Sequence, residues 1–387
     1  MIKNPIIFSF FSGCGFLDLG FENSGFDVKF VNEFHKPFHD AYKYARSQMN
    51  MSVPAYDHHL GSVESFIDDS ASICRLTSYI KSAKEQSLVG FIGGPPCPDF
   101  SSAGKNNGRS GKNGRLTEIF VQILIKYQPD FFLIENVKGL WKTAKHRAFY
   151  QEMKDLLEKS GFLMTDRLTN SIEFGVPQAR DRILLFGIHK KHINSGLNIG
   201  EIFPWEKHIK FDKQIIMQKG IWPTVSPYLE NTHLDRPISI PDELEELTVE
   251  HWFKKNKVYQ HANANNHFIP RQALVKFQNI EEGDVKGKSF KRLHRWRYSP
   301  TAAYGNNEVH LHPYLSRRLS AAEAMAIQSL PRDFILPPYM NLSDMFKTIG
   351  NGVPYLLSQA VALSIRDFLT EIEKGKSLKP THLTMTI

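Results

Sequence analysis

Short apolar runs rich in β-branched and aromatic residues alternate with longer amphipathic stretches over the first half of the chain. The runs predict strands at residues 6–10, 28–31, 88–92, 131–134 and 183–188. The amphipathic stretches predict helices at residues 66–84, 116–127 and 149–160. Strands that alternate with helices predict an α/β fold, a doubly wound Rossmann-like parallel sheet with helices on both faces.

The pattern changes after about residue 195, where periodicity weakens and turn-forming clusters accumulate. We therefore expect a catalytic domain at residues 1–195 and a smaller, loop-rich domain at residues 196–316. Helical periodicity returns at residues 320–329 and 356–374, so the segment 317–387 is expected to return to the first domain and complete it.

The composition is that of a globular protein, with 41% hydrophobic and 23% charged residues. The apolar run at residues 6–11 is short for a secretory signal, and no run is long enough for a membrane-spanning helix, so no membrane partner is expected. A net charge of +8 favours a polyanionic partner, although a mildly basic enzyme of another kind has the same balance.

The cysteines and histidines argue against a disulfide framework and against a metal site. There are 3 cysteines and no Cys-x-x-Cys spacing, which fits a reducing cytoplasm. The pairs His58-His59 and His310-Leu-His312 lack further ligands at metal-site spacing, so no metal is expected.

A glycine-bearing turn, Phe-Ser-Gly-Cys-Gly at residues 11–15, directly follows the first predicted strand. Backbone amides in such a turn can approach a ligand closely. Glu33 lies just past the second strand, where a doubly wound fold places a carboxylate that binds ribose hydroxyls; a solvated surface carboxylate is the alternative. The three-glycine dinucleotide pattern is absent, so a cofactor with a single nucleoside fits better.

A second motif, Gly-Gly-Pro-Pro-Cys-Pro at residues 93–98, follows the third predicted strand. Ligands bind at the carboxyl ends of strands in such sheets, so Cys97 is positioned like a nucleophile. The alternative is a buried structural thiol. The polar segment 101–115 that follows carries four cations, which would lower the thiol pKa, and its Gly, Asn and Ser content predicts a mobile loop.

Two further motifs follow along the chain. Glu135 ends the strand at residues 131–134 and is expected at the same sheet edge as Cys97, with a surface loop carboxylate as the alternative. Gln178, Arg180 and Arg182 lead into the next strand, and alternation would place them on one face. Two such arginines can clamp a phosphate or a base carbonyl, although exposed arginines are the commoner case.

The order of these motifs resembles that of the C5-cytosine DNA methyltransferase family over nearly the whole chain. The segments that match its cofactor, nucleophile, glutamate, arginine and two last motifs are residues 11–15, 96–97, 135–137, 178–182, 318–331 and 350–354. Three positions depart from the family pattern. Pro98 replaces a glutamine, Ser62 stands where an aspartate near the cofactor adenine is common, and Ser9 replaces an acidic residue.

The resemblance implies a DNA (cytosine-5-)-methyltransferase that acts on a cytosine flipped out of duplex DNA. Cys97 would add to C6 of the base, Glu135 would bind N3, and Arg182, supported by Arg180, would bind O2. The cofactor implied is S-adenosylmethionine. The residues expected to hold it are Phe11, Ser12, Gly13, Gly15, Glu33, Phe34, Ser62, Pro96, Asn351, Gly352 and Val353.

Contacts to DNA are expected from two segments. In the segment 101–115, which would close over the duplex unless it is only a solvated linker, they are Ser101, Lys105, Arg109, Lys112 and Arg115. In the second domain, which should choose the sequence, cations interleave with aromatic residues over residues 286–298, for which a solvated basic surface is the alternative. The contacts expected there are Lys291, Arg292, Arg295 and Arg297.

The family resemblance suggests a monomer in a restriction-modification system, with a cognate restriction endonuclease acting on the same site without direct contact. The alternatives are a tRNA cytosine-5 methyltransferase, a catalytically dead DNA-binding protein and a methyltransferase for a small metabolite. The long second domain favours DNA over tRNA. The presence of Cys97, Glu135 and Arg182 together argues against a dead enzyme.

Overall fold

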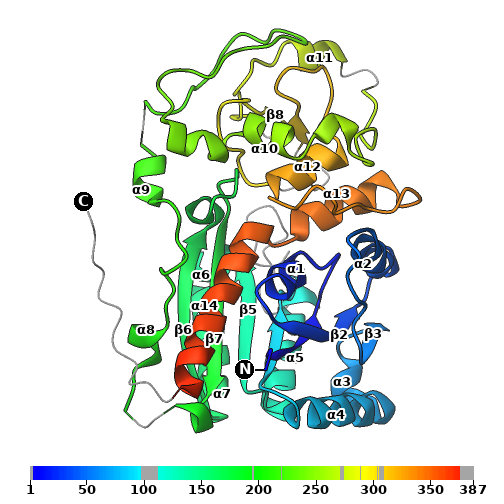
Figure 1. Cartoon of the computed structure of the whole chain (residues 1–387), viewed down its shortest axis with the longest axis vertical. Coiled ribbons are helices and arrows are strands. Elements are labelled where there is room, and N and C mark those ends of the chain that lie inside the picture. Colours follow the sequence, from blue (N-terminus) through cyan, green and yellow to red (C-terminus); the bar gives the residue numbers. More distant parts are fainter. Residues whose placement is uncertain are drawn as a thin grey trace.

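The computed structural model of the protein describes residues 3–96, 112–193, 196–218, 220–270, 274–287, 289–302, 304 and 309–374. A seven-stranded sheet with helices packed on it forms one half of the molecule, the lower half in Figure 1. Short helices and irregular segments from the second half of the chain form the upper half. This is the α/β class with a Rossmann-like sheet that the sequence predicts.

The sheet has the order β3-β2-β1-β4-β5-β7-β6. Its strands are β1 (Ile6–Phe10), β2 (Asp27–Glu33), β3 (Asp57–Leu60), β4 (Val89–Gly93), β5 (Phe131–Val137), β6 (Phe162–Asn170) and β7 (Asp181–His189). All five predicted strands are present with slightly different ends. The sequence prediction missed β3 and β6, since both lie at sheet edges and carry polar residues that break the apolar run.

The sheet is not wholly parallel, so the prediction of a parallel sheet is wrong at one end. Strands β1 to β5 pair in parallel, but β7 runs antiparallel to both β5 and β6. The connection from β6 to β7, residues 171–180, holds only the short 3-10 helix η2 (Ser171–Phe174) and no crossover helix. As a result the first residues of β7 lie beside the last residues of β5, and Arg182 pairs in register with Val137.

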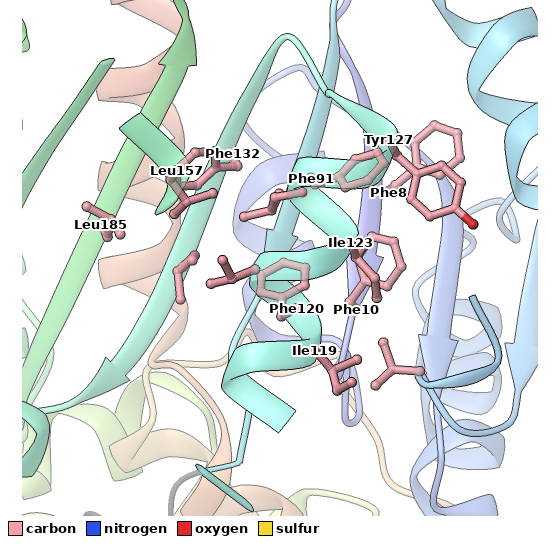
Figure 2. Packing of buried hydrophobic residues seen from close by; sticks show 14 of the residues in the cluster. Phe8, Phe10, Phe91, Ile119, Phe120, Ile123, Tyr127, Phe132, Leu157 and Leu185 are labelled. Atoms are coloured by element: carbon pink, nitrogen blue, oxygen red, sulfur yellow. The ribbon is translucent and has the colours of Figure 1, made fainter. Parts of the chain in front are cut away.

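Helices cover both faces of the sheet, and alternation along β1 shows why. Ile6, Phe8 and Phe10 pack on the side of α3 (Ser65–Asp68), α4 (Ser70–Lys84), α5 (Lys112–Tyr127) and α7 (Ala144–Lys159). Figure 2 shows this face, where Phe120 and Ile123 of α5 lie over the strands. Ile7 points to the other face, which is covered by α1 (Phe16–Glu22), α2 (Lys36–Gln48) and α14 (Tyr355–Glu373).

The helix predicted at residues 66–84 is divided at Asp69. Asp69 has an extended backbone, with φ of −103° and ψ of 116°, and its carboxylate accepts a hydrogen bond from the backbone N–H of Ser72 at 2.8 Å. An aspartate in this conformation caps the N-terminus of α4 and ends α3 before it. The short helix α6 (Gly139–Lys142) follows β5 directly and carries the chain away from the sheet edge.

The upper half is built from short elements around two apolar clusters that include Trp222, Trp252 and Trp296. Its elements are α9 (Lys213–Ile216), η4 (Asp242–Leu247), α10 (Val249–Lys255), η5 (Val258–Gln260), α11 (Leu274–Gln278), β8 (Phe290–Arg292) and β9 (Val309–Leu311). The helix α8 (Ile199–Ile202), which precedes them, packs against β6 in the lower half. The chain then forms α12 (Ala321–Ile327) and α13 (Leu342–Asn351) before α14 packs beside α1.

Apolar contacts cross both expected domain boundaries, which remain predictions. Phe203 stacks on Phe186 of β7, with ring centroids 4.3 Å apart, so the chain still packs on the sheet after residue 196. Ala322 and Ala326 of α12 belong to the same apolar cluster as Val249 of α10. No helix within the described part of the chain is both long and apolar enough to cross a membrane.

Candidate active site

A cleft of about 2190 Å³ lies over the carboxyl ends of the central strands. It is lined from below by the ends of β1, β2 and β5. From above it is lined by α13 and by Lys291, residues 300–302, Tyr304, Val309, His310 and Arg318. The predicted site residues that line it are Phe11, Ser12, Gly13, Glu33, Phe34, Ser62, Pro96, Arg115, Glu135, Arg180, Arg182, Lys291, Asn351, Gly352 and Val353. The tertiary structure thus brings together motifs from both ends of the chain.

Some predicted residues lie outside the described part of the chain. These are Cys97, Ser101, Lys105 and Arg109, together with Pro98. Lys112 begins α5, and its side chain is likewise outside the described part. Their assigned roles therefore remain predictions from the sequence.

The turn after β1 depends on left-handed backbone conformations. Phe11, Gly13 and Gly15 have φ of 55°, 58° and 78°. A Cβ atom on Gly15 would lie 2.3 Å from the Tyr42 ring, so no other residue fits there without movement. The Arg46 guanidinium, fully buried, donates to the Gly15 carbonyl at 2.8 Å and holds the turn from below. Gly15 itself does not line the cleft; it shapes the turn that does.

Glu33 is tied to this turn by hydrogen bonds to both carboxylate oxygens. The Gly13 N–H donates to Oε2 at 2.8 Å and the His35 N–H donates to Oε1 at 2.7 Å. The side chain is buried in the cleft wall, so the surface-carboxylate alternative is wrong. Phe34, the next residue, is 74% exposed at the cleft. A fixed carboxylate beside an exposed aromatic ring is suited to a nucleoside.

A contact between this region and α13 was not predicted from the sequence. His35 Nε2 lies 2.9 Å from Asp344 Oδ1, and Asp344, Lys347 and Thr348 all line the cleft. Burial raises the pKa of Asp344, but the hydrogen bonds from His35 and Asn341 outweigh it, and the net pKa is lowered. The amphipathic pattern of residues 342–351 was the signal available for this helix in the sequence.

Glu135 and Arg182 form an ion pair in the floor of the cleft, with Arg182 Nε 2.5 Å from Glu135 Oε1. Both side chains are nearly buried. A Cβ atom on Gly94 would lie 2.9 Å from Glu135 Oε2, so the glycine leaves room for this carboxylate at the end of β4. The surface-loop alternative for Glu135 is therefore wrong. Its carboxylate lies at the end of β5, as the sequence predicts, and pairs there with the Arg182 guanidinium.

Gln178 and Arg180 precede β7, so the prediction that they share a strand face with Arg182 is wrong. Arg180 is buried, and its Nη1 and Nη2 donate to the carbonyls of Ala302 at 3.0 Å and Gly350 at 2.8 Å. Burial lowers the pKa of Arg180. Gln178 donates to Gln328 Oε1 at 3.1 Å. Both side chains join the sheet to later segments.

Two of the three departures from the family pattern have a local partner. The Ser9 hydroxyl donates to Asp18 Oδ1 at 2.7 Å, and burial raises the pKa of Asp18 to about 6. Ser62 Oγ lies 3.3 Å from Glu64 Oε2 at the cleft. Glu64 in turn pairs with Arg115 at 3.1 Å, and the Arg115 side chain is 67% exposed.

The structure contradicts the DNA contacts predicted for Arg292 and Arg295. The Arg292 guanidinium is buried and donates to the carbonyls of Phe277, Ile280 and His312. Arg295 is buried in an ion pair with Glu282, whose two oxygens accept from Nε and Nη2 at 2.9 Å each. Both cations hold the second half of the chain together and cannot reach a phosphate.

The other two cations of this cluster remain candidates. Lys291 lines the cleft and Arg297 is partly exposed, with its guanidinium 5.2 Å from the centre of the Tyr298 ring. No group of three or more His, Cys, Asp or Glu side chains that could hold a metal ion occurs among the residues that the structure describes.

Comparison with known proteins decides the family. A family model described as C-5 cytosine-specific DNA methylase matches residues 6–367. The chain belongs to this family. It is therefore a methyltransferase enzyme whose reaction is the C5 methylation of cytosine in DNA. The family resemblance inferred from the ordered motifs is confirmed.

Relatives and a solved structure agree with this C5-cytosine methylase assignment. The chain is 52% identical over 369 residues to the Type II methyltransferase M.NmeDI of Neisseria meningitidis serogroup C, covering 95% of this chain and 84% of that protein. It is 27% identical to M.NgoPII of Neisseria gonorrhoeae, over 95% of this chain and 97% of that one. A crystal structure of a prophage-encoded DNA modification methyltransferase from E. coli shares the fold, with a TM-score of 0.60, 19% identity, and coverage of 95% of this chain and 100% of that one.

Proposed function

We propose that the protein transfers a methyl group from S-adenosylmethionine to C5 of a cytosine flipped out of a specific duplex sequence, as the methyltransferase of a restriction-modification system. The observation that carries this proposal is the Glu135–Arg182 ion pair in the floor of a cleft that the cofactor turn also lines. The Type II names of the relatives support the restriction-modification role.

The residues around the turn fit the cofactor. Each oxygen of the Glu33 carboxylate accepts one backbone N–H, which leaves lone pairs for ribose hydroxyls. The exposed Phe34 ring offers a face to an adenine. Ser62, Pro96 and the segment 351–353 close the same part of the cleft. S-adenosylmethionine bound there would supply the methyl group as an electrophile on its sulfonium.

The reacting base would be handled by three side chains. The Cys97 thiolate forms a bond to C6, and the ring electrons move toward C5, which makes C5 nucleophilic. Glu135 binds N3 and so stabilises the charge that develops on the ring. Arg182 binds O2, and its ion pair with Glu135 keeps both groups oriented before the base arrives. C5 would then take the methyl group from the sulfonium as the bond from methyl to sulfonium breaks. Loss of the C5 proton to a base such as water would next break the bond from the Cys97 sulfur to C6 and restore the ring.

The substrate would reach this site only after leaving the helix stack, since Cys97 attacks the face of the ring. The cleft is large enough for a nucleotide beside the cofactor. We infer that the residues of segment 101–115 contact phosphates and that the upper half of the molecule recognises the DNA sequence. We also infer that the protein acts as a monomer.

Methyl transfer from radiolabelled S-adenosylmethionine to mixed-sequence duplex DNA tests the proposal, with bisulfite sequencing of the product. The wild type is compared with Cys97→Ala and with Cys74→Ala, whose cysteine is exposed on α4. Label on cytosine C5 in one short sequence, lost only in Cys97→Ala, is the expected result. Label on tRNA instead would indicate the RNA reaction. Duplex binding without transfer to either would indicate a dead binding protein.

A further inference from the structure

A row of aromatic rings lines part of the cleft. The ring centroids of Phe268 and Phe346 lie 5.5 Å apart, those of Phe346 and Tyr304 5.4 Å, and those of Tyr304 and His310 5.3 Å. All four residues line the cleft. They come from the upper half of the molecule and from α13, so the wall exists only in the folded protein.

Arg318 ends this row as a cation without a counter-ion. Its guanidinium carbon lies 5.1 Å from the centre of the Phe268 ring, and the side chain lines the cleft. No carboxylate of the described residues pairs with it, and burial lowers its pKa. The neighbouring Arg317, by contrast, donates to both oxygens of Glu323 at 2.8 and 2.7 Å. A partly desolvated arginine without a partner is costly unless an anion binds to it.

His310 presents unpaired polar atoms on the same wall. The residue is 2% exposed, and neither ring nitrogen has a hydrogen-bond partner in the part of the chain that the structure describes; nor does the Tyr304 hydroxyl. Burial lowers the pKa of His310 to about 3, so the ring is neutral at pH 7 and carries one N–H donor. A buried polar group without a partner destabilises the protein, and a ligand with acceptor oxygens would provide that partner.

The charge of this wall selects the kind of ligand. Lys291 pairs in register with His310 across the β8–β9 ladder, and Lys291 and Lys347 also line the cleft. The Arg318 guanidinium and the His310 ring N–H are both hydrogen-bond donors that an acceptor oxygen would satisfy. The guanidinium is stabilised further by a negatively charged acceptor. Within a DNA substrate, the phosphodiester group has both properties.

We propose that Phe268, Tyr304, His310 and Arg318 form a DNA-backbone binding site, in which Arg318 neutralises one phosphate and the His310 N–H donates to the backbone of the same strand. This inference rests on the proposed function, because it takes duplex DNA as the occupant of the cleft. The residues are separate from the segment 101–115 and from the cations at residues 291–297 that the sequence pointed to. Arg318 opens the matched segment 318–331, but no role was assigned to its side chain from the sequence.

The salt dependence of duplex binding tests the Arg318 contact. The dissociation constant of a labelled mixed-sequence duplex is measured over a range of salt concentrations without S-adenosylmethionine, for the wild type, Arg318→Gln and Arg75→Gln. Arg75 is exposed on α4, outside the cleft, and controls for loss of one charge. Each phosphate contact contributes about 0.9 to the slope of log K against log salt, so Arg318→Gln should lower the slope by about that amount. It should weaken binding about tenfold at low salt. An unchanged slope would overturn the assignment.

His310→Phe tests the second contact, because phenylalanine keeps the ring and removes both nitrogens. We expect weaker DNA binding with an unchanged salt slope, and a melting temperature at or above that of the wild type. A variant that binds DNA as the wild type does would show that His310 has no role in binding. If Arg318→Gln lowers the salt slope as expected but the wild type methylates no DNA, only the proposed function fails. If the wild type methylates DNA and Arg318→Gln has the same salt slope as the wild type, only this inference fails.

Discussion

Arg182 Nε lies 2.5 Å from Glu135 Oε1 because β7 runs antiparallel to β5. A parallel β7 would place its first residues at the opposite edge of the sheet, far from the end of β5. The antiparallel strand instead opposes Arg182 to Val137, two residues beyond Glu135 on the same strand. The ion pair at the base of the cleft is therefore a product of sheet topology.

We expect Glu135→Gln and Arg182→Lys each to lower kcat for DNA methylation. Glutamine keeps the shape of the carboxyl group but not its charge, and lysine keeps the charge but not the fork of Arg182. The loss should be roughly 10²–10³-fold, as for other positioned acid–base and electrostatic groups. Single-turnover kinetics measure it, and the affinity for S-adenosylmethionine should stay unchanged. A variant with wild-type kcat would remove that residue from the chemistry.

Gly15→Ala should destabilise the protein strongly. The residue has φ of 78°, and the added Cβ would meet the Tyr42 ring at 2.3 Å. The control is Gly220→Ala, where φ is 96° but nothing lies within 4 Å of the added atom. Backbone strain alone costs about 1 kcal/mol, so the control measures that part and Gly15→Ala should exceed it by about 1–3 kcal/mol. Urea unfolding gives both values, and equal losses would show that the turn can relax.

Arg295→Ala should destabilise the protein. The fraction that folds should bind DNA with the affinity of the wild type. Removal of one member of a buried ion pair leaves Glu282 without its partner, which costs about 3–5 kcal/mol. Arg297→Gln serves as the control, since that side chain is partly exposed and has a small expected effect on stability. Thermal unfolding distinguishes the two. A stable Arg295→Ala with weakened DNA binding would restore the original prediction from the sequence.

Stability should fall as the pH drops below about 6.5. Burial lowers the pKa of His294 to about 4 and that of His310 and His312 to about 3. The unfolded chain therefore binds more protons than the folded one between these values and the ordinary histidine pKa, so the stabilisation present above pH 6.5 is lost on acidification. Each histidine contributes about 1.4 kcal/mol per pH unit in this window. Urea unfolding from pH 7.5 to 5 measures the slope, and His310→Phe should make it shallower.

Asp18 has the opposite pH dependence. Burial raises its folded pKa to about 6 from the ordinary value of 3.8. Its stabilising contribution is thus complete below about pH 4 and is lost as the pH rises through 6. Asp18→Asn, which can still accept from the Ser9 hydroxyl, should stabilise the protein at pH 8 by about 3 kcal/mol and have no such effect at pH 4. Equal effects at both pH values would assign the change to packing.

The residues at the ends of the central strands show best how much of the site could be predicted from the sequence. The apolar runs located the central strands because a strand covered on both faces excludes polar residues locally. The polar residues directly after those runs, Glu33 and Glu135, then had to lie at one edge of the sheet. The positions of Glu33 and Glu135 at the cleft could therefore be predicted from adjacent residues alone. Edge strands such as β3 follow no such rule, since only one side is paired.

The sequence by itself determined the α/β class, the central strands and the order of motifs that identifies the family, because each depends on residues close together in the chain. The tertiary structure decided which cations are available. Arg292, Arg295 and Arg318 cannot be told apart from the sequence. Arg292 is buried and hydrogen-bonded to carbonyls and Arg295 is buried and paired with Glu282, while Arg318 faces the cleft without a counter-ion among the described residues. A charge is stable inside a protein only with a partner, and those partners come from distant segments that folding alone brings together.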